Sequence, residues 1–133
     1  CSGAEWLASA ASSKYAASSA TVGNVGVYNL ILDRTDQLAN EGIKVNAISA
    51  GKNKLMGASF QPLSDEHRAM LQSRVDSIYS DFKKAVTRGR KVDSSALDGQ
   101  AMTGTEGVQS GLIDGIYPTL EALIVALKKM GGQ

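Results

Sequence analysis

Ser2 and Lys54 are the residues whose types and surroundings could perform nucleophilic chemistry. Ser2 is followed by two small residues and then by Trp6–Ala11, a run that favours a helix, so we expect the Ser2 hydroxyl at a helix N-terminus. Unpaired backbone N–H groups and the helix dipole stabilise negative charge there, such as the oxyanion of a tetrahedral acyl intermediate. A helix cap without chemical function also explains Ser2, and the first eight residues alone favour that interpretation.

A serine hydroxyl becomes a good nucleophile only when a nearby base removes its proton. A lysine can be that base if its amine is neutral, which requires burial among apolar groups and distance from carboxylates. Lys54 fits best by context, because it follows a predicted strand, precedes Leu55 and Met56, and has no acidic residue between Glu41 and Asp65. For any one lysine, a solvated surface charge is the more common outcome.

The composition indicates a globular domain with its own core. The chain has 133 residues, 43% of them hydrophobic, and a formal net charge of +1. Its lysines and arginines form no basic stripe, so we expect no nucleic-acid partner. The longest apolar run, residues 122–127, is far shorter than the ~20 residues of a membrane-spanning helix. We therefore expect a soluble, cytoplasmic protein without a membrane segment.

The single cysteine and the single histidine restrict the possible chemistry. Cys1 cannot form a disulfide within the chain, and Cys1 with His67 does not supply the usual zinc ligand sets, so no metal and no cofactor are expected. A Ser-His-Asp triad would have to use His67, which we interpret as a surface residue. A Ser-Lys pair has many lysines available.

Hydrophobic periodicity and capping residues predict alternating strands and helices. Strand, helix and strand over residues 22–48 imply a crossover connection and a layered α/β fold. The glycines within residues 22–28 mark a candidate cleft wall, where another backbone comes close. The expected strands are 14–18, 22–28, 43–48 and 112–116, and the expected helices are 6–13, 30–40, 64–88, 94–97, 105–111 and 118–130, the last burying Leu120, Leu123, Ile124, Leu127 and Met130.

Four segments resemble, in the same order, motifs of the signal peptide peptidase A type of Ser-Lys serine peptidases. Residues 2–8 resemble the nucleophile segment S-G-G-Y-Y-I-A, and residues 22–27 resemble the G-S-I-G-V stretch. Residues 51–54 are similar to the G-x-x-K segment that carries the lysine base. Residues 98–101 with 111–114 resemble the C-terminal signature G-x-x-A…G-L-V-D. Together these motifs cover nearly the whole chain.

Two further segments are most similar to the phage and prophage branch of that family, the head-maturation or minor-capsid proteases. These segments are residues 33–45 and the run Ser59–Ser64 before the long predicted helix. The resemblance implies a ClpP/crotonase-like fold with parallel strands and crossover helices, and assembly into homo-oligomers. It further implies Ser2 as nucleophile, Lys54 as general base and the Gly3 N–H as one oxyanion donor.

The sequence departs from the family pattern in two ways. Asn24 stands where the family usually has a serine that orients the lysine, and its side-chain oxygen could accept the same hydrogen bond. The chain opens directly on the nucleophile motif, so we expect residues 1–133 to be the C-terminal portion of a single Ser-Lys peptidase domain whose N-terminal part is missing.

The resulting hypothesis is a serine endopeptidase that hydrolyses polypeptides through an acyl-enzyme. Capsid or scaffold proteins are the expected substrates, in the host cytoplasm or the virion. One alternative is a bacterial enzyme that degrades signal peptides, which the lack of a membrane anchor in these residues disfavours unless an anchor lies upstream. Another is a catalytically silent assembly protein with the same fold. An acyl-CoA-handling enzyme of the crotonase superfamily would share the fold without needing Ser2 and Lys54.

Overall fold

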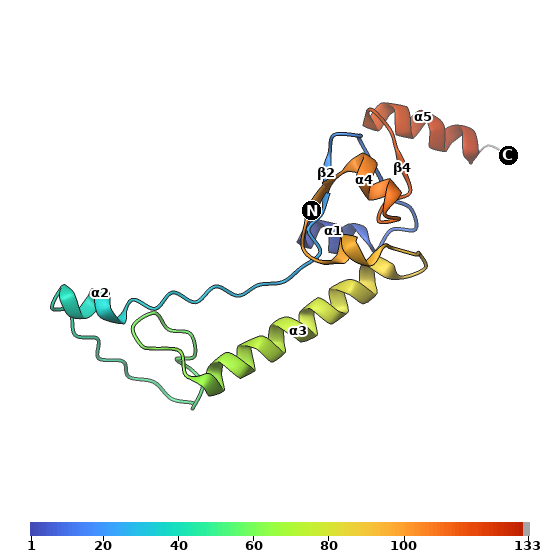
Figure 1. Ribbon diagram of the computed structural model, residues 1–133. Coiled ribbons are helices and arrows are strands. Elements are labelled where there is room, and N and C mark those ends of the chain that lie inside the picture. Colours follow the sequence, from blue (N-terminus) through green and yellow to red (C-terminus); the bar gives the residue numbers. More distant parts are fainter. Residues whose placement is uncertain (132–133) are drawn as a thin grey trace. The chain divides into compact units, whose positions relative to one another are not determined.

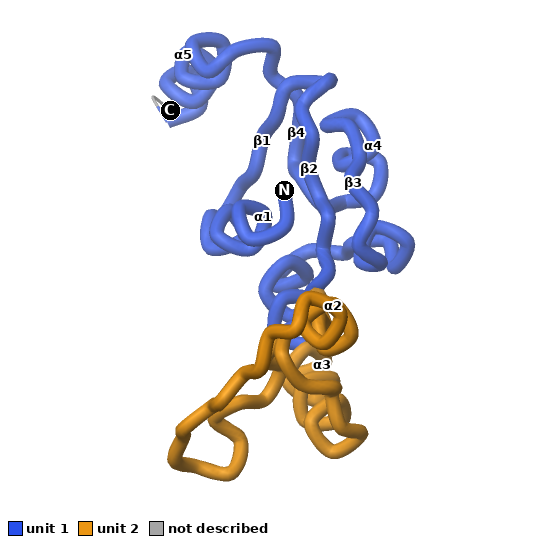
Figure 2. The backbone as a smooth tube through the Cα atoms, turned by 90° about the vertical axis from the view of Figure 1, so that its left-hand side faces the viewer, with its two compact units in different colours: residues 1–27, 78–133 blue, residues 28–77 orange. Residues whose placement is uncertain are grey.

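The computed structural model describes residues 1–131 and has a mixed α/β fold (Figure 1). The chain divides into two compact units (Figure 2). Unit 1 consists of Cys1–Val27 and Ile78–Gln133, and unit 2 consists of Tyr28–Ser77. Unit 1 contains every strand and every buried residue that the structure describes.

Two small sheets in unit 1 join its N-terminal and C-terminal segments. Strand β1 (Tyr15–Ala16) pairs in parallel with β4 (Gly115–Ile116). Strand β2 (Thr21–Gly23) pairs antiparallel with β3 (Ala101–Thr103), so that Gly23 lies opposite Ala101. The α/β class expected from the sequence is confirmed, although each strand is shorter than predicted and β3 was not predicted.

The core of unit 1 lies where helix α4 (Gly104–Gln109) packs on β2. Glycines permit this close approach: a Cβ on Gly107 would lie 2.7 Å from the Val22 side chain, and one on Gly104 would lie 2.1 Å from the Ala17 carbonyl oxygen. The buried apolar residues form one cluster, which consists of Val22, Val25, Phe82, Val86, Leu112 and Ile113.

The long predicted helix is present as α3 (Asp65–Thr87), with the acidic residues Asp65 and Glu66 in its first turn. Its last part, from Ile78 onwards, belongs to unit 1. There Phe82 and Val86 are fully buried, and the Tyr79 hydroxyl donates a hydrogen bond to the Leu97 carbonyl. Burial of Tyr79, together with the nearby Asp98 carboxylate, raises the pKa of this phenol above its ordinary value.

The remaining helices of unit 1 are α1 (Gly3–Ala8), the 3₁₀ helix η1 (Ser94–Leu97) and α5 (Leu120–Met130). Helix α4 begins one residue before the predicted helix over 105–111, because Thr103 caps it and forms a reciprocal capping box with Glu106. The predicted buried face of α5 is wrong for the described residues. Leu120 is 66% exposed and Met130 is 67% exposed, because no described element covers that face.

Unit 2 consists of helix α2 (Thr35–Asn40), the first part of α3 and the segments around them. The helix predicted for residues 30–40 begins only at Thr35, where the Asp33 carboxylate accepts hydrogen bonds from the Thr35 N–H and hydroxyl. The helix ends at Asn40 as predicted. Gly42, at a φ of 69°, and the hydrogen bond from the Ile43 N–H to the Leu38 carbonyl close it in a Schellman motif.

The strand predicted for residues 43–48 is absent. Apolar and polar residues do alternate in this segment, but no described strand of unit 2 pairs with it. A strand without a partner gains no ladder of hydrogen bonds. Its apolar side chains are accordingly exposed, with Ile48 at 100%. The crossover that this strand was expected to complete is therefore not formed within the described chain.

Substituting Gly104 should test the packing of α4. Gly104→Ala should lower the free energy of unfolding by about 2 kcal/mol, since the new methyl group would require the Ala17 backbone to move. Gly131→Ala is the matched control, because its Cβ would meet nothing closer than 3.6 Å, and it should be nearly neutral. Urea unfolding followed by circular dichroism measures both, and equal stability of the two variants would contradict the packing argument.

The capping box should make unfolding pH-dependent. Hydrogen bonds from the Thr103 N–H and hydroxyl lower the pKa of Glu106 below its ordinary value of 4.5. A lowered folded-state pKa adds stability above the unfolded-state pKa, and this contribution is lost as the pH falls through the folded-state value. Urea unfolding between about pH 6 and pH 3 should therefore show a smaller loss of stability in Glu106→Gln than in the wild type. A steeper loss in the variant would refute this.

Candidate active site

Ser2 is held in a backbone conformation that side-chain-bearing residues rarely adopt. It precedes α1 with φ 56° and ψ −121°, and such a conformation costs about 1–3 kcal/mol and persists only where its surroundings fix it. The Ser2 N–H donates to the Gly23 carbonyl at 2.7 Å, and the Ser2 carbonyl accepts from the Trp6 N–H at 3.1 Å. The sequence predicted a serine at the start of a helix but not this sharp turn.

Helix α1 is held against the rest of unit 1 by its side chains. The Trp6 ring stacks on the Phe82 ring with centroids 4.9 Å apart, and the Arg88 guanidinium donates to the Ser9 carbonyl at 3.3 Å. In the sequence Trp6 and Phe82 belong to two separate predicted helices. Their stacking attaches the short helix that follows Ser2 to the buried end of α3.

Gly3 leaves space beside the serine. It is exposed and begins α1, so its N–H belongs to the first turn, where backbone donors have no partner within the helix. A Cβ built on Gly3 would meet no atom within 4 Å, so packing within the described chain does not require a glycine here. The oxyanion role assigned to Gly3 stays a prediction, and this open backbone is compatible with it.

Asn24 adopts a second strained conformation, one residue beyond β2, at a φ of 57°. Its N–H donates to the Gln100 carbonyl at 2.8 Å, and its side-chain Nδ2 donates to the Gly99 carbonyl at 2.6 Å. The first bond holds the backbone, and the second holds the side-chain amide, whose Oδ1 is its acceptor atom. A role for that oxygen in orienting the lysine stays a prediction.

The structure shows which hydrogen bonds the two parts of the C-terminal signature, residues 98–101 and 111–114, form. Its first part, at Gly99 and Gln100, supplies the two carbonyls that hold Asn24. In its second part, the Asp114 carboxylate accepts from the Lys14 N–H at 2.6 Å, and the Asp114 N–H donates to the Lys14 carbonyl at 2.7 Å. The two parts of the signature therefore hold the backbone at Lys14, directly before β1, and at Asn24, directly after β2.

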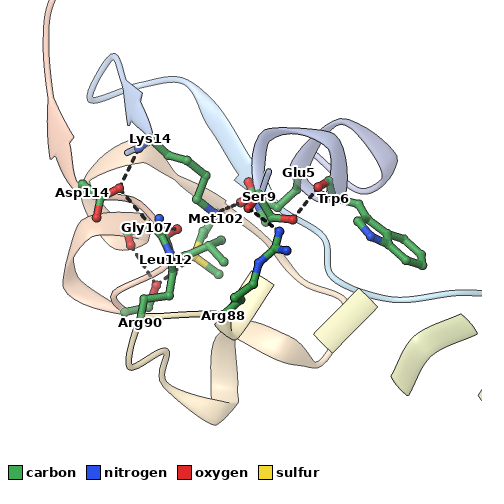
Figure 3. A network of polar contacts seen from close by, with 12 residues as sticks. Glu5, Trp6, Ser9, Lys14, Arg88, Arg90, Met102, Gly107, Leu112 and Asp114 are labelled. Atoms are coloured by element: carbon green, nitrogen blue, oxygen red, sulfur yellow. Dashed lines mark hydrogen bonds and ion pairs between the residues drawn. The ribbon is translucent and has the colours of Figure 1, made fainter. Parts of the chain in front are cut away.

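A buried ion pair between Glu5 and Lys14 was not predicted from the sequence. Lys14 Nζ lies 2.5 Å from Glu5 Oε1, and both side chains are about 5% exposed (Figure 3). The second Glu5 oxygen accepts from the Gly23 N–H at 3.4 Å. A usable signal exists in the sequence, since Glu5 and Lys14 are the sole charged side chains among the first 32 residues. Two lone opposite charges in such an apolar stretch favour a buried pair.

Lys54 lies in unit 2, in the turn-rich segment that follows residues 43–48. Its N–H donates to the Gly51 carbonyl at 3.1 Å, and its side chain is exposed in the described chain. The apolar burial expected for a lysine base is thus not supplied by unit 2 itself. The neighbouring Lys52 forms an exposed ion pair with Glu66, in which Lys52 Nζ lies 2.6 Å from Glu66 Oε1. Pairing of Lys54 with Ser2, which belongs to unit 1, stays a prediction.

The strained turn at Ser2 is compatible with a site of the serine hydrolase type, and the role of Ser2 as nucleophile stays a prediction. A serine on a strained turn that leads directly into a helix is the local arrangement by which α/β-hydrolases expose their nucleophile. The comparison with known families agrees with this class. The sequence model of peptidase family S49 matches residues 1–131, and the chain belongs to that family.

Curated relatives include proteases from three kinds of organism. Capsid assembly protease C of Escherichia phage lambda is 30% identical over 128 residues, which are 94% of this chain and 29% of the relative. A provisionally named protease of Methanocaldococcus jannaschii is 30% identical over 106 residues, 77% of this chain and 34% of the relative. A provisionally named signal peptide peptidase SppA of Enterococcus faecium is 28% identical over 126 residues, 92% of this chain and 37% of the relative.

The chain therefore spans about a third of the length of the relatives it matches. Among residues 1–131, no helix has both the length and the apolar character needed to cross a membrane. No group of three or more metal-ligating side chains occurs within the same range.

Replacing Ser2 should reveal the strain at this turn. Ser2→Gly should be more stable to urea than Ser2→Ala by about 1 kcal/mol, because glycine adopts a φ of 56° without a Cβ penalty. At Ser9, which has a φ of −66°, the same pair of substitutions should show the opposite order, with alanine the more stable. If Ser2→Ala is as stable as Ser2→Gly, the turn is not strained.

Proposed function

We propose that this chain belongs to a serine endopeptidase that uses a Ser2–Lys54 dyad. The observation that carries the proposal is the strained turn at Ser2, which presents a half-buried hydroxyl next to the open backbone of Gly3, in a chain of peptidase family S49. The family supplies the reaction class, and the local geometry supports Ser2 as the residue on which that reaction is centred.

In this mechanism the neutral Lys54 amine takes the proton of the Ser2 hydroxyl, and the Ser2 oxygen attacks the peptide carbonyl. The Gly3 N–H stabilises the negative charge on the carbonyl oxygen in the tetrahedral intermediate. The protonated Lys54 then gives its proton to the leaving amine, so an acyl-enzyme forms. Water, activated by the same amine, hydrolyses the ester and regenerates Ser2. Asn24 Oδ1 accepts a hydrogen bond that orients the lysine.

Lys54 needs surroundings that unit 2 alone does not provide. A neutral lysine is favoured by burial among apolar groups, whereas Lys54 is exposed in the described chain. The apolar side chains of residues 43–48 are exposed as well, and they precede Lys54 closely in the sequence. We propose that assembly into a homo-oligomer covers both and that the oligomer is the active form.

The proposed substrates are polypeptides, and capsid or scaffold proteins are the first class to test. The name of the phage lambda relative describes a capsid assembly protease, and that match extends over 94% of this chain. Processing of this kind would take place in the host cytoplasm or in the virion. Degradation of signal peptides is the alternative, supported by the name of the Enterococcus faecium relative. A silent assembly protein is the alternative outside enzymes.

Cleavage assays on matched variants test the dyad. The purified protein should degrade casein or a phage scaffold protein, and Ser2→Ala and Lys54→Ala should each lower kcat by at least ~10³-fold, because removing one member disables the pair. Lys52→Ala is the matched control, since Lys52 is an exposed lysine two residues away whose partner is Glu66. It should cleave like the wild type.

Two results would overturn the proposal. One is a wild-type protein that cleaves neither substrate, which favours the silent assembly protein. The other is cleavage by Ser2→Ala or Lys54→Ala at the wild-type rate, which would assign the activity to other residues. Preference for signal peptides over scaffold protein would move the function to the alternative substrate class while keeping the dyad.

A further inference from the structure

The buried charges of unit 1 are linked to the proposed nucleophile through Gly23 and are not used by the proposed reaction. Glu5 and Lys14 are the buried charged side chains of the described residues, at 5% and 6% exposure. Burying an ion pair costs desolvation free energy that an apolar pair of similar volume would not cost. Stability alone therefore does not explain why charges occupy these positions, which suggests a role in arranging the neighbouring residues.

The contacts of Glu5 lead directly to Ser2. The Gly23 residue at the end of β2 is bound from both sides: its carbonyl accepts from the Ser2 N–H at 2.7 Å, and its N–H donates to Glu5 Oε2 at 3.4 Å. Ser2 and Glu5 lie three residues apart, before and within the first turn of α1. The first turn is thus attached to Gly23 at two points, one of which includes the strained residue itself.

The Lys14 end of the pair is held just as firmly. Lys14 pairs its N–H and its carbonyl with Asp114, directly before β1. The Asp114 carboxylate in turn accepts from Arg90 Nη1 at 3.1 Å, and the same Arg90 atom donates to the Leu112 carbonyl (Figure 3). Lys14 Nζ therefore projects from a fixed backbone, and it fixes the position of Glu5 Oε1.

We propose that Glu5, held by Lys14, is a positioning residue that keeps Ser2 in its reactive conformation by binding Gly23. The inference rests on the proposed function, because it assumes that Ser2 is the nucleophile. Neither Glu5 nor Lys14 touches the reacting atoms in this scheme. The Lys14 amine donates to Glu5, which distinguishes it from Lys54, the proposed base. A small displacement of a nucleophile lowers the rate of the chemical step far more than it weakens substrate binding.

Two double variants separate positioning from simple support of the fold. Glu5→Gln with Lys14→Met removes both charges but keeps an amide oxygen that can accept from Gly23. Glu5→Met with Lys14→Met removes both charges and that acceptor at similar volume. Both should fold, because a buried ion pair tolerates replacement by uncharged side chains of similar volume. Asp81→Asn with Lys84→Gln is the control, since this exposed pair lies on α3.

The expected result is a difference between the two double variants in kcat. The variant with Met at position 5 should lose about 10- to 100-fold in kcat with little change in KM. The kcat of the variant with Gln at position 5 should be at least about tenfold higher than that of the variant with Met. Hydrogen exchange at the Gly23 and Ser2 amides should be faster with Met than with Gln at position 5, while exchange at Phe82 and Val86 stays the same. The control pair should have wild-type kcat.

The outcomes distinguish this inference from the proposed function. If the wild type cleaves, Ser2→Ala does not, and the two double variants have equal kcat, Glu5 does not position Ser2 and the dyad proposal stands. If the wild type does not cleave, or Ser2→Ala cleaves normally, the proposed function fails and this inference fails with it. Circular dichroism and thermal unfolding establish that both double variants are folded before their rates are compared.

Discussion

The hydrogen bond from the Ser2 N–H to the Gly23 carbonyl is the contact on which the candidate site depends. It joins the residue before α1 to the last residue of β2, and it helps to hold Ser2 at a positive φ. Gly23 can take part because it is buried and itself adopts a φ of 82°, which a glycine accommodates without strain. Its partner Ala101 then ties the same point to β3 and to the C-terminal half of unit 1.

Unit 1 concentrates its unusual backbone conformations and its buried charges around this one strand end. Ser2 and Asn24, both non-glycine residues with positive φ, flank Gly23, one through a hydrogen bond and one through the chain. Strain of this kind persists only where surrounding contacts over-determine it. Here the contacts come from Gln100 and from the first turn of α1. In the adjoining core, the glycines of α4 allow this helix to pack closely on β2.

Unit 2 differs from unit 1 because local contacts, and not a buried core, stabilise it. None of its described residues is buried, and its helix α2 is stabilised by local contacts, namely the Asp33 turn at its start and the Schellman motif at its end. The apolar residues of 43–48 have no counterpart to pack against within the unit. The chain matches family S49 over residues 1–131 and spans about a third of the length of each relative.

Much of the fold could be predicted because its signals are local. The long helix α3 was predicted from hydrophobic periodicity, and the Ser64 hydroxyl at its start accepts a hydrogen bond from the His67 N–H. The helix end at Asn40 and the 3₁₀ turn after Asp93 were predicted from single capping residues. The strand at 43–48 and the buried face of α5 were wrong, because periodicity reports what a segment could bury and not whether a partner is present.

The sequence by itself determined the family and the identities of the candidate residues, because motif order and residue type are properties of the chain alone. It also determined that Ser2 precedes a helix, since small residues and caps act over a few positions. Only the tertiary structure decided that Ser2 is strained, that Gly23 holds it, and that Glu5 meets Lys14 behind it. Those contacts join segments that are distant in the chain, as Asp114 and Lys14 are. They form because packing of the whole of unit 1 brings these segments together.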